Sequence, residues 1–231
     1  MSEHSRRAQK KALTRAHVRE TAQRLFAERG FDTVTIADVA AAADVAVQTV
    51  FNHFATKEEL YWSERTPWVS GPENAVRERP AGVPALRALR GYLVFAIGDH
   101  VEGLATAEGR RLVTVLGSSP GLQAAERELV HESESRLRAA LLEAWTGPGA
   151  ESPRPVRPAV TAGLVAATWL ATTRMLVTEP RDPLPAPEDV PTLAAAAREL
   201  AAQLLTRFES DVTEQLVAGE DAVQPEALRA S

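Results

Sequence analysis

Two amide side chains, Gln48 and Asn52, are spaced four residues apart in the N-terminal part of the chain. Residues four apart share one face of a helix, and a Gln or Asn amide can form two hydrogen bonds with the edge of an adenine in the DNA major groove. Val47 and the Thr49 methyl group could contact a thymine methyl group, and the Thr49 hydroxyl could reach a phosphate. A solvated helix face would accept the same residues, so the pattern has to be judged together with the elements around it.

Residues 47–53 contain no Arg or Lys, so cations for a phosphate backbone must come from elsewhere. Thr35 and Lys57 stand at the starts of two expected helices, where free backbone N–H groups attract anions. The N-terminus is also basic: residues 1–30 hold eight basic and three acidic residues, which leaves 18 basic and 28 acidic residues in the other 201. This segregation indicates that one end of the chain meets an anion, and we expect residues 1–11 to contact phosphates.

Apolar residues recur at three- and four-residue spacing, and no alternating strand pattern occurs, so the chain is predicted to be all-α. One apolar stripe predicts a helix from Thr14 that Gly30 ends. Thr35 is a plausible N-cap of a short helix over 36–42, and a second short helix over 47–54 follows a turn of about four residues. Thr56, with Glu59 three residues on, suggests a capping box for a helix from Lys57 to about Arg65.

Two short helices joined by a tight turn, with a third packed against them, form the arrangement that places the second helix in a major groove. The segment TIADVAAAADVAVQTVFNHFATKEEL, with LFAERGFDTVT before it, closely resembles the DNA-binding signature of the TetR/AcrR family of bacterial transcription regulators. The resemblance covers roughly residues 12–72. The DNA-binding residues expected from the pattern and the resemblance together are Thr35, Val47, Gln48, Thr49, Phe51, Asn52, His53 and Lys57. For His53, packing of the ring against a neighbouring helix remains an alternative to phosphate contact.

The sequence departs from the family pattern at three positions. Asp44 stands where the family usually has Gly, at a turn position where positive φ costs Asp more than Gly. Ala46 replaces the usual Ser or Thr, which removes an N-cap and a possible phosphate donor. Phe51 replaces the common Tyr, so the phenol can no longer bond the DNA backbone. Affinity is therefore expected to be weaker or more salt-sensitive than is usual for the family.

The Pro- and Gly-rich segment 67–84 predicts the end of the DNA-binding domain. The expected domains are a helix-turn-helix domain over 12–72, a helical effector-binding and dimerisation domain over 73–216, and a tail over 217–231. Further helices are expected at about 84–104, 107–116, 121–145, 158–178 and 192–216.

The helix expected over 158–178 is apolar or small nearly all round, and the one over 192–216 has a broad apolar stripe. Together they could form a four-helix interface with a second copy, as the resemblance implies; alternatively, both complete a monomeric bundle. A dimer would present two recognition helices to half-sites about one DNA turn apart, or a multiple of it, so a near-palindromic operator is expected.

The resemblance also implies a small-molecule effector inside the C-terminal bundle. Candidate lining residues are Tyr92, Phe95, His100, Trp169, Arg174 and Met175, although side chains of these types are more often core or interface residues. Trp62 and Trp68, near the domain junction, could couple such a pocket to the DNA-binding domain.

Composition argues against several other classes of protein. The chain has no cysteine, no Gly-rich phosphate loop and no HExxH motif, so neither an enzyme nor a metal or other cofactor is expected. The N-terminus does not read as a secretory signal, and the uncharged stretch 158–173 is too short and too polar to span a bilayer; a cytoplasmic protein is expected.

The leading hypothesis is a homodimeric repressor that a small molecule releases from its operator. The alternative is a DNA-binding architectural or interaction protein without an effector.

Overall fold

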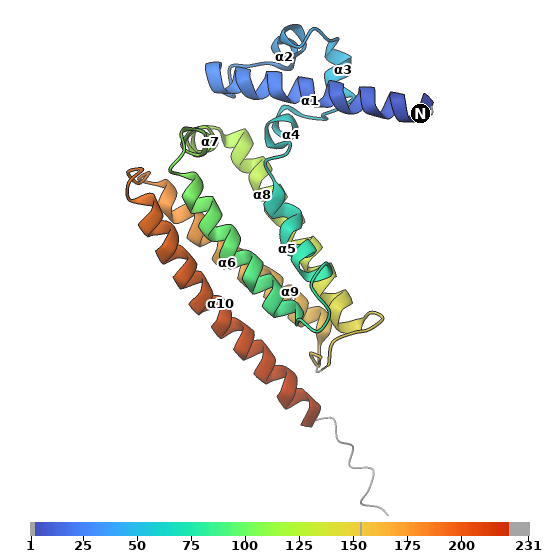
Figure 1. Ribbon diagram of the computed structural model, residues 1–231, viewed down its shortest axis with the longest axis vertical. Coiled ribbons are helices and arrows are strands. Elements are labelled where there is room, and N and C mark those ends of the chain that lie inside the picture. The colour runs from blue at the N-terminus through green and yellow to red at the C-terminus, as the bar shows by residue number, and fades with distance from the viewer. Residues whose placement is uncertain (1–2, 153, 222–231) are drawn as a thin grey trace, which may run out of the picture. The chain divides into compact units, whose positions relative to one another are not determined.

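A computed structural model describes residues 3–152 and 154–221, and this part of the chain is helical with no β-strand (Figure 1). The all-α prediction is confirmed. The chain forms two compact units. The first holds the residues up to Pro67 together with Arg111–Glu128, and the second holds Trp68–Arg110 and the residues from Leu129 onward.

The first unit is built on α1 (Glu3–Arg29), α2 (Ile36–Ala42), α3 (Val47–Phe51) and α4 (Lys57–Trp62). Its core collects the apolar stripe of α1 with the inward residues of the short helices: Val18, Ala22, Leu25, Phe26, Val39, Val50, Phe54 and Leu60 are all at most 2% exposed. Gly30 ends α1 with a φ of +84°, as its position in the sequence suggested. Burial of small and branched side chains therefore holds together helices too short to be stable alone.

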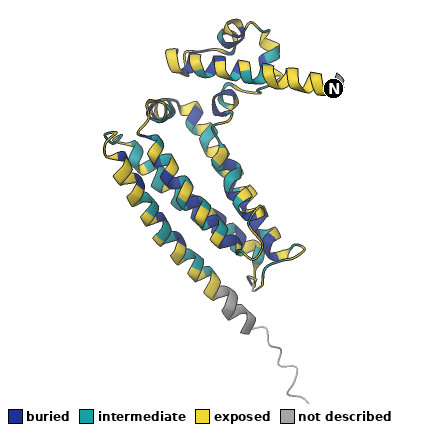
Figure 2. Ribbon diagram, in the orientation of Figure 1, coloured by how far each residue is buried: buried dark blue, intermediate teal, exposed yellow. Residues whose placement is uncertain are grey.

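Helix α1 begins at Glu3, eleven residues before the predicted start at Thr14. The residues from Ser5 to Leu13 are exposed, so no apolar stripe marks these turns in the sequence (Figure 2). Ala, Arg, Lys and Gln are good helix formers, and they extend the helix once its packed part has nucleated it. The predicted basic arm is therefore a helical extension of α1.

Two helix ends differ from the prediction, and one helix was not predicted. Helix α3 ends at Phe51 rather than at residue 54, and α4 ends at Trp62 rather than near Arg65. Helix α5 (Pro67–Arg77) lies where the sequence predicted a connection. Pro67 occupies the first helical position, where the missing N–H costs nothing. Pro72 lies inside the helix and is buried with Val69 and Val76, so packing outweighs the helix-breaking tendency of proline.

The second unit contains α5, α6 (Ala85–Gly103), most of α8 (Pro120–Thr146), α9 (Pro158–Thr178), the short 3₁₀ turn Glu179–Arg181 and α10 (Val190–Asp221). Most of α7 (Ala107–Ser118) and the first turns of α8 belong to the first unit. These helices agree closely with the predicted ranges. Helix α10 continues to Asp221, so residues 217–221 of the expected tail are helical, and residues 222–231 lie outside the described part of the chain. The core joins α5, α6, α8, α9 and α10 around Leu89, Leu137, Trp145 and Trp169.

Helices α6 and α10 form the most extensive packing surface of this unit. Gly98 lies directly beneath Arg198, and a Cβ atom at position 98 would collide with the Arg198 side chain. Arg198 pairs with Glu102 at 2.7 Å, and Arg90 pairs with Glu209 at 2.6 Å. The glycine therefore lets the two helices approach closely enough for side chains of α10 to reach α6.

The uncharged stretch 158–173 was expected to be too short and too polar to span a bilayer, but the helix continues beyond it. The segment Pro158–Arg181, with a mean hydropathy of 1.4, is long and apolar enough to cross a membrane by length and composition alone. Only 22% of its most apolar stretch is buried. Composition alone does not decide the role of the helix, because a helix at an interface of a soluble protein has the same composition. Val160, Leu164 and Met175 are 54 to 64% exposed along it. Helix α9 thus has an apolar face that residues 3–152 and 154–221 leave uncovered.

Candidate nucleic-acid interface

Thr35 fixes the start of α2 through a capping box. Its hydroxyl accepts a hydrogen bond from the Asp38 backbone N–H at 3.1 Å and donates to the Asp38 carboxylate at 2.6 Å, and the Thr35 N–H donates to the same carboxylate at 2.8 Å. The Thr35 hydroxyl bond, followed by the backbone bond, holds the pKa of Asp38 below its usual value. Because the Thr35 hydroxyl already donates to Asp38, contact with a phosphate would have to compete with this box.

The turn between α2 and α3 has the backbone conformation expected from the sequence. Asp44 has a φ of +52°, in the left-handed region where glycine is preferred and Asp is tolerated at a cost. Ala43 is buried beside it, and the Val45 N–H donates to the Ala40 carbonyl at 3.0 Å. At Ala46, the N-cap of α3, no side chain bonds the helix start. Two of the departures read from the sequence therefore have the expected structural consequence.

Helix α3 turns one side chain inward and presents the others to solvent. Val50 is fully buried, Val47 and Phe51 are 41% and 46% exposed, and Gln48 and Asn52 are exposed, while Thr49 is half-buried. The Gln48 side-chain N–H donates to the Asn52 side-chain oxygen at 3.2 Å. The Gln48 oxygen and the Asn52 amino group remain available, which makes one acceptor and one donor side by side. Adenine presents the complementary pair, its N6 amino group and N7.

His53 is half-buried and oriented toward α1. Burial, followed by the charges of Lys11 and Arg15, lowers its pKa, so the ring is neutral at pH 7. Its Nδ1 atom is buried without a hydrogen-bond partner. Arg15 donates to the His53 backbone carbonyl and stacks over the Phe54 ring at 4.1 Å. These contacts favour the packing alternative for His53.

Lys57 supports the loop between α1 and α2. Its Nζ donates to the carbonyls of Phe31 at 2.9 Å and Val34 at 3.1 Å, and it lies 4.1 Å from the centre of the Phe31 ring. These bonds engage two of its three N–H groups, leaving one that could reach a phosphate. At the start of α4 the Thr56 hydroxyl accepts from the Glu59 N–H at 3.0 Å, as predicted, while the returning bond to Glu59 comes from the Ala55 N–H at 2.7 Å.

Seven of the eight Arg and Lys residues of α1 fall into two groups. Arg15, Arg19 and Arg24 pair with carboxylates of the same unit. Among the described side chains, those of the first turns form no such ion pair and are exposed; they are Arg6, Arg7, Lys10 and Lys11. The first turns therefore carry the positive charge that is free to meet an external anion.

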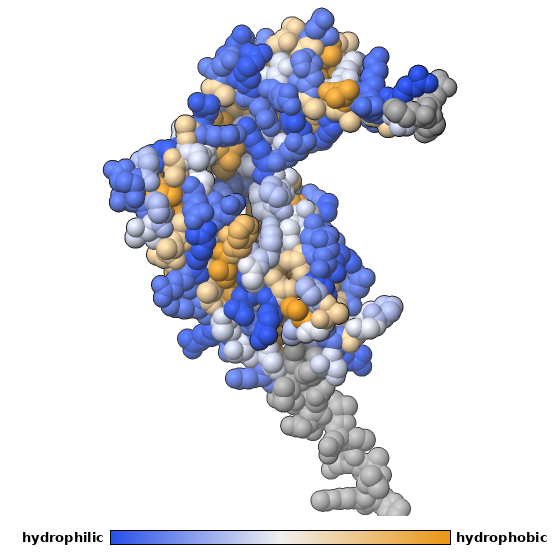
Figure 3. Space-filling view, in the orientation of Figure 1, coloured by the Kyte–Doolittle hydropathy of each residue, from blue (hydrophilic) through white to orange (hydrophobic). Residues whose placement is uncertain are grey.

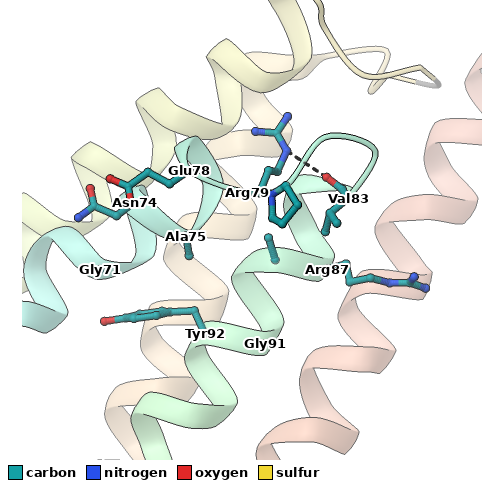
Figure 4. Close-up of a pocket in the computed structure, with 11 residues that line it drawn as sticks. Gly71, Asn74, Ala75, Glu78, Arg79, Val83, Arg87, Gly91 and Tyr92 are labelled. Carbon is teal, nitrogen blue, oxygen red and sulfur yellow. Dashed lines mark hydrogen bonds between the residues drawn. The ribbon is translucent and has the colours of Figure 1, made fainter.

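The six predicted effector residues do not gather at one place. Tyr92 lines a groove between α5 and α6 (Figure 4). Trp169 is buried in the core, whereas Phe95, Arg174 and Met175 are exposed. Burial, with a smaller effect of Arg181, lowers the pKa of His100 to about 4, and its Nε2 lies 3.2 Å from an Arg181 nitrogen.

The two junction tryptophans belong to different units: Trp62 is buried in the first unit, and Trp68 is half-buried in the second.

One contact of the first unit has no signal in the sequence. Ser119, just before α8, is 1% exposed and donates from its hydroxyl to the Asp32 carboxylate at 2.9 Å. The Glu58 carboxylate lies close to Gly121. The corner between α7 and α8 thus packs on the loop after α1 and on α4. The described residues contain no group of three or more His, Asp or Glu side chains that could hold a metal ion.

The capped α2, the tight turn and the exposed α3 define a helix-turn-helix protein. Residues 18–62 match the family model of the bacterial regulatory proteins of the tetR family. The chain is 30% identical over 135 residues to the transcriptional regulator TcmR of Streptomyces glaucescens, covering 57% of this chain and 60% of TcmR. It is 26% identical over 222 residues to the regulator EthR of Mycolicibacterium smegmatis, covering 94% and 81%. It spans about 60% of the length of the first curated relatives it matches.

Two solved structures share the fold. NalD, the secondary repressor of the MexAB-OprM multidrug efflux pump in Pseudomonas aeruginosa, has a TM-score of 0.50 at 23% identity, covering 82% of this chain and 95% of NalD. SmeT of Stenotrophomonas maltophilia, in its triclosan complex, has a TM-score of 0.51 at 18% identity, covering 83% and 91%. The helix-turn-helix segment thus matches the tetR family of bacterial regulatory proteins, the curated relatives are transcriptional regulators, and the solved structures share the fold.

The uncapped start of α3 generates a prediction about stability. In Ala46→Ser, the new hydroxyl can accept from the Gln48 N–H in the first turn of α3, because residue 46 already has the extended backbone of an N-cap, with a ψ of 146°. We expect the free energy of unfolding to rise by about 0.5 to 2 kcal/mol, measured by urea denaturation. Ala41→Ser, at an exposed position inside α2 that cannot cap a helix, is the control. Equal effects of the two substitutions would contradict the capping explanation.

Proposed function

We propose that this protein is a homodimeric, sequence-specific DNA-binding repressor of bacterial transcription that a small-molecule effector releases from its operator. The observation that carries the proposal is the exposed pair Gln48 and Asn52 on α3, joined by a hydrogen bond. The role would place the protein in the cytoplasm, with the chromosome.

The proposed reading of DNA uses the two free polar groups of this pair. The Gln48 oxygen accepts from the adenine N6 amino group while the Asn52 amino group donates to N7. Val47 and Phe51 flank the pair with apolar surface suited to thymine methyl groups. Since α3 has no cation, sequence selectivity comes from α3 and most of the electrostatic affinity from α1.

Removing either member of the pair should therefore affect specific binding. Gln48→Ala and Asn52→Ala should each weaken binding to the operator by about 1 to 3 kcal/mol and leave binding to random duplexes nearly unchanged. Because the two side chains act together, the double variant should cost less than the sum of the single variants. Mobility-shift titrations with the DNA beside the protein's own gene and with a random duplex of equal length measure these effects.

Gln203→Ala, on the exposed face of α10, is the matched control and should change neither affinity. Equal losses on both kinds of DNA would refute the base-reading role. Wild-type protein that bound all duplexes alike would instead support an architectural DNA-binding protein.

The helical extension of α1 should bind phosphates of the DNA backbone. Replacing Arg6, Arg7, Lys10 and Lys11 with Gln keeps the helix and removes four charges. The slope of log K against log salt concentration should then become shallower by about 0.9 for each phosphate that the variant no longer neutralises. Arg138→Gln combined with Arg207→Gln removes exposed charges of the second unit and is the control. An unchanged slope in the α1 variant would show that this extension stays off the DNA.

Dimerisation is supported by the uncovered apolar surface of the second unit. Val160, Leu164 and Met175 lie exposed on α9, and Leu193 and Leu200 lie exposed on α10. Apolar side chains repeated along two long helices suit a four-helix contact with a twofold-related copy. A symmetric dimer would present two copies of α3, so we propose a near-palindromic operator with half-sites one DNA turn apart, or a multiple of it.

A charge placed in the centre of this surface should separate the protomers. Leu164→Glu would bury an unpaired carboxylate in the proposed interface, which is strongly unfavourable, so we expect a monomer in sedimentation velocity experiments where the wild-type protein is a dimer. Ala139→Glu, at an exposed position on α8, should remain dimeric. A wild-type monomer, or a dimeric Leu164→Glu variant, would contradict the proposed interface.

Release by an effector requires that the ligand bind more tightly to a dimer geometry in which the two α3 helices no longer match successive grooves. The groove between α5 and α6 supports this part of the proposal because it offers a concave surface in the second unit. A ligand of the free protein should raise its melting temperature and lower operator binding in the same concentration range.

A further inference from the structure

We propose that the groove between α5 and α6 binds an uncharged, largely apolar small molecule that carries one polar group for the Tyr92 hydroxyl. The inference rests on the proposed function, in which such a molecule is the effector. Its binding site nevertheless differs from the set of residues that the sequence suggested.

The groove has the size of a small-molecule site. Its volume is about 670 Å³, within the range of ligand pockets. It runs along α6 from the α5–α6 loop at Val83 to Tyr92 (Figure 4). The eight helical residues from Ala85 to Tyr92 correspond to about 12 Å of length, which matches a molecule of two or three fused or linked rings, or a chain of similar length.

Small apolar side chains form the inner surface of the groove. Ala75 lies on the α5 side, and Ala88 and Gly91 lie on the α6 side. Gly91 is exposed, and a Cβ atom added there would meet no atom within 4 Å, so the surface opens directly over the helix backbone. Phe95, one turn further along α6, is 64% exposed, and hydrophobic surface gathers over the middle of α6 in the space-filling view (Figure 3). The groove therefore favours an apolar body.

The charges around the groove oppose a charged ligand. Arg79 is neutralised: it pairs with Glu151 at 2.8 Å and donates to the carbonyls of Val83 and Val76. Glu78, directly after α5, and Arg87 on α6 are exposed and lie on opposite rims (Figure 4). A cation or an anion in the groove would face one attractive and one repulsive rim charge, so the rims give it no net stabilisation, and it would lose hydration on the apolar floor. An uncharged molecule avoids both costs.

Tyr92 supplies a specific polar contact at the far end. Its ring extends across the groove to α5, where the hydroxyl lies over Gly71 (Figure 4). A Cβ atom at position 71 would collide with this hydroxyl, so the glycine is what admits the ring. Burial raises the pKa of Tyr92, and Asp99 raises it further. The hydroxyl therefore stays protonated and can donate to an uncharged acceptor such as an alcohol or a carbonyl oxygen.

Three probes of nearly identical shape test the chemistry of the ligand: 2-naphthylmethanol, 2-naphthoate and 2-naphthylmethylammonium. Isothermal titration calorimetry with the full-length protein at pH 7 and without DNA should show the alcohol binding at least about tenfold more tightly than either ion. Preferred binding of either ion would overturn the proposed ligand class. Failure of the alcohol to bind at its solubility limit would overturn the site.

Filling the groove tests its location. Gly91→Leu places a side chain in the open space and should weaken binding of 2-naphthylmethanol by at least about tenfold. Gly103→Leu, also on α6 and also without an atom within 4 Å of the added Cβ, is the matched control and should leave binding unchanged. Equal affinities of the two variants would show that the molecule binds elsewhere.

Tyr92→Phe tests the polar contact and keeps the ring in case Gly91→Leu fails to fold. It should weaken binding of 2-naphthylmethanol by about two- to tenfold and leave binding of 2-methylnaphthalene unchanged. Equal effects on the two probes would refute the hydroxyl contact. Binding that meets all these criteria but does not alter operator affinity would contradict effector release while leaving the groove assignment intact.

Discussion

The proposed interface depends on how a five-residue helix is held in place. Helix α3 is far too short to be stable by itself. Val50 and, just after the helix, Phe54 anchor it in the core of the first unit, and both are at most 1% exposed. Arg15 adds a second attachment by donating to the His53 carbonyl while stacking on Phe54. Two apolar anchors and one bound carbonyl thus allow the rest of α3 to face solvent in a fixed orientation.

The short elements of the first unit were predictable because their signals are local. Thr35 and Thr56 cap helices through residues three positions away, and Gly30 and Asp44 occupy backbone conformations that few residues adopt. The first turns of α1 were missed because helix formers without an apolar stripe give no periodic pattern. Helix α5 was missed because Pro72, buried inside it, looks in the sequence like the end of a helix.

Less of the candidate sites could be anticipated. The spacing of Gln48 and Asn52 indicated a shared face but not the hydrogen bond between them. For Lys57 and His53 the residue type suggested phosphate contact, whereas the structure uses much of their bonding capacity or surface internally. The aromatic residues expected to line a pocket were chosen by type, and Phe95 and Trp169 differ completely in exposure. The groove depends instead on Gly91 and two alanines, which carry no recognisable chemical signature.

The hydrogen bond from Ser119 to Asp32 joins residues 87 positions apart within one compact unit. Leu116 and Leu122, on either side of Ser119, are also buried. A fragment cut after the fourth helix would therefore lose part of its own hydrophobic interior. Exchange of the second unit between proteins of this architecture, whether by recombination or in the laboratory, would have to keep the segment around Ser119 with the residues up to Pro67, so the two compact units interleave along the gene.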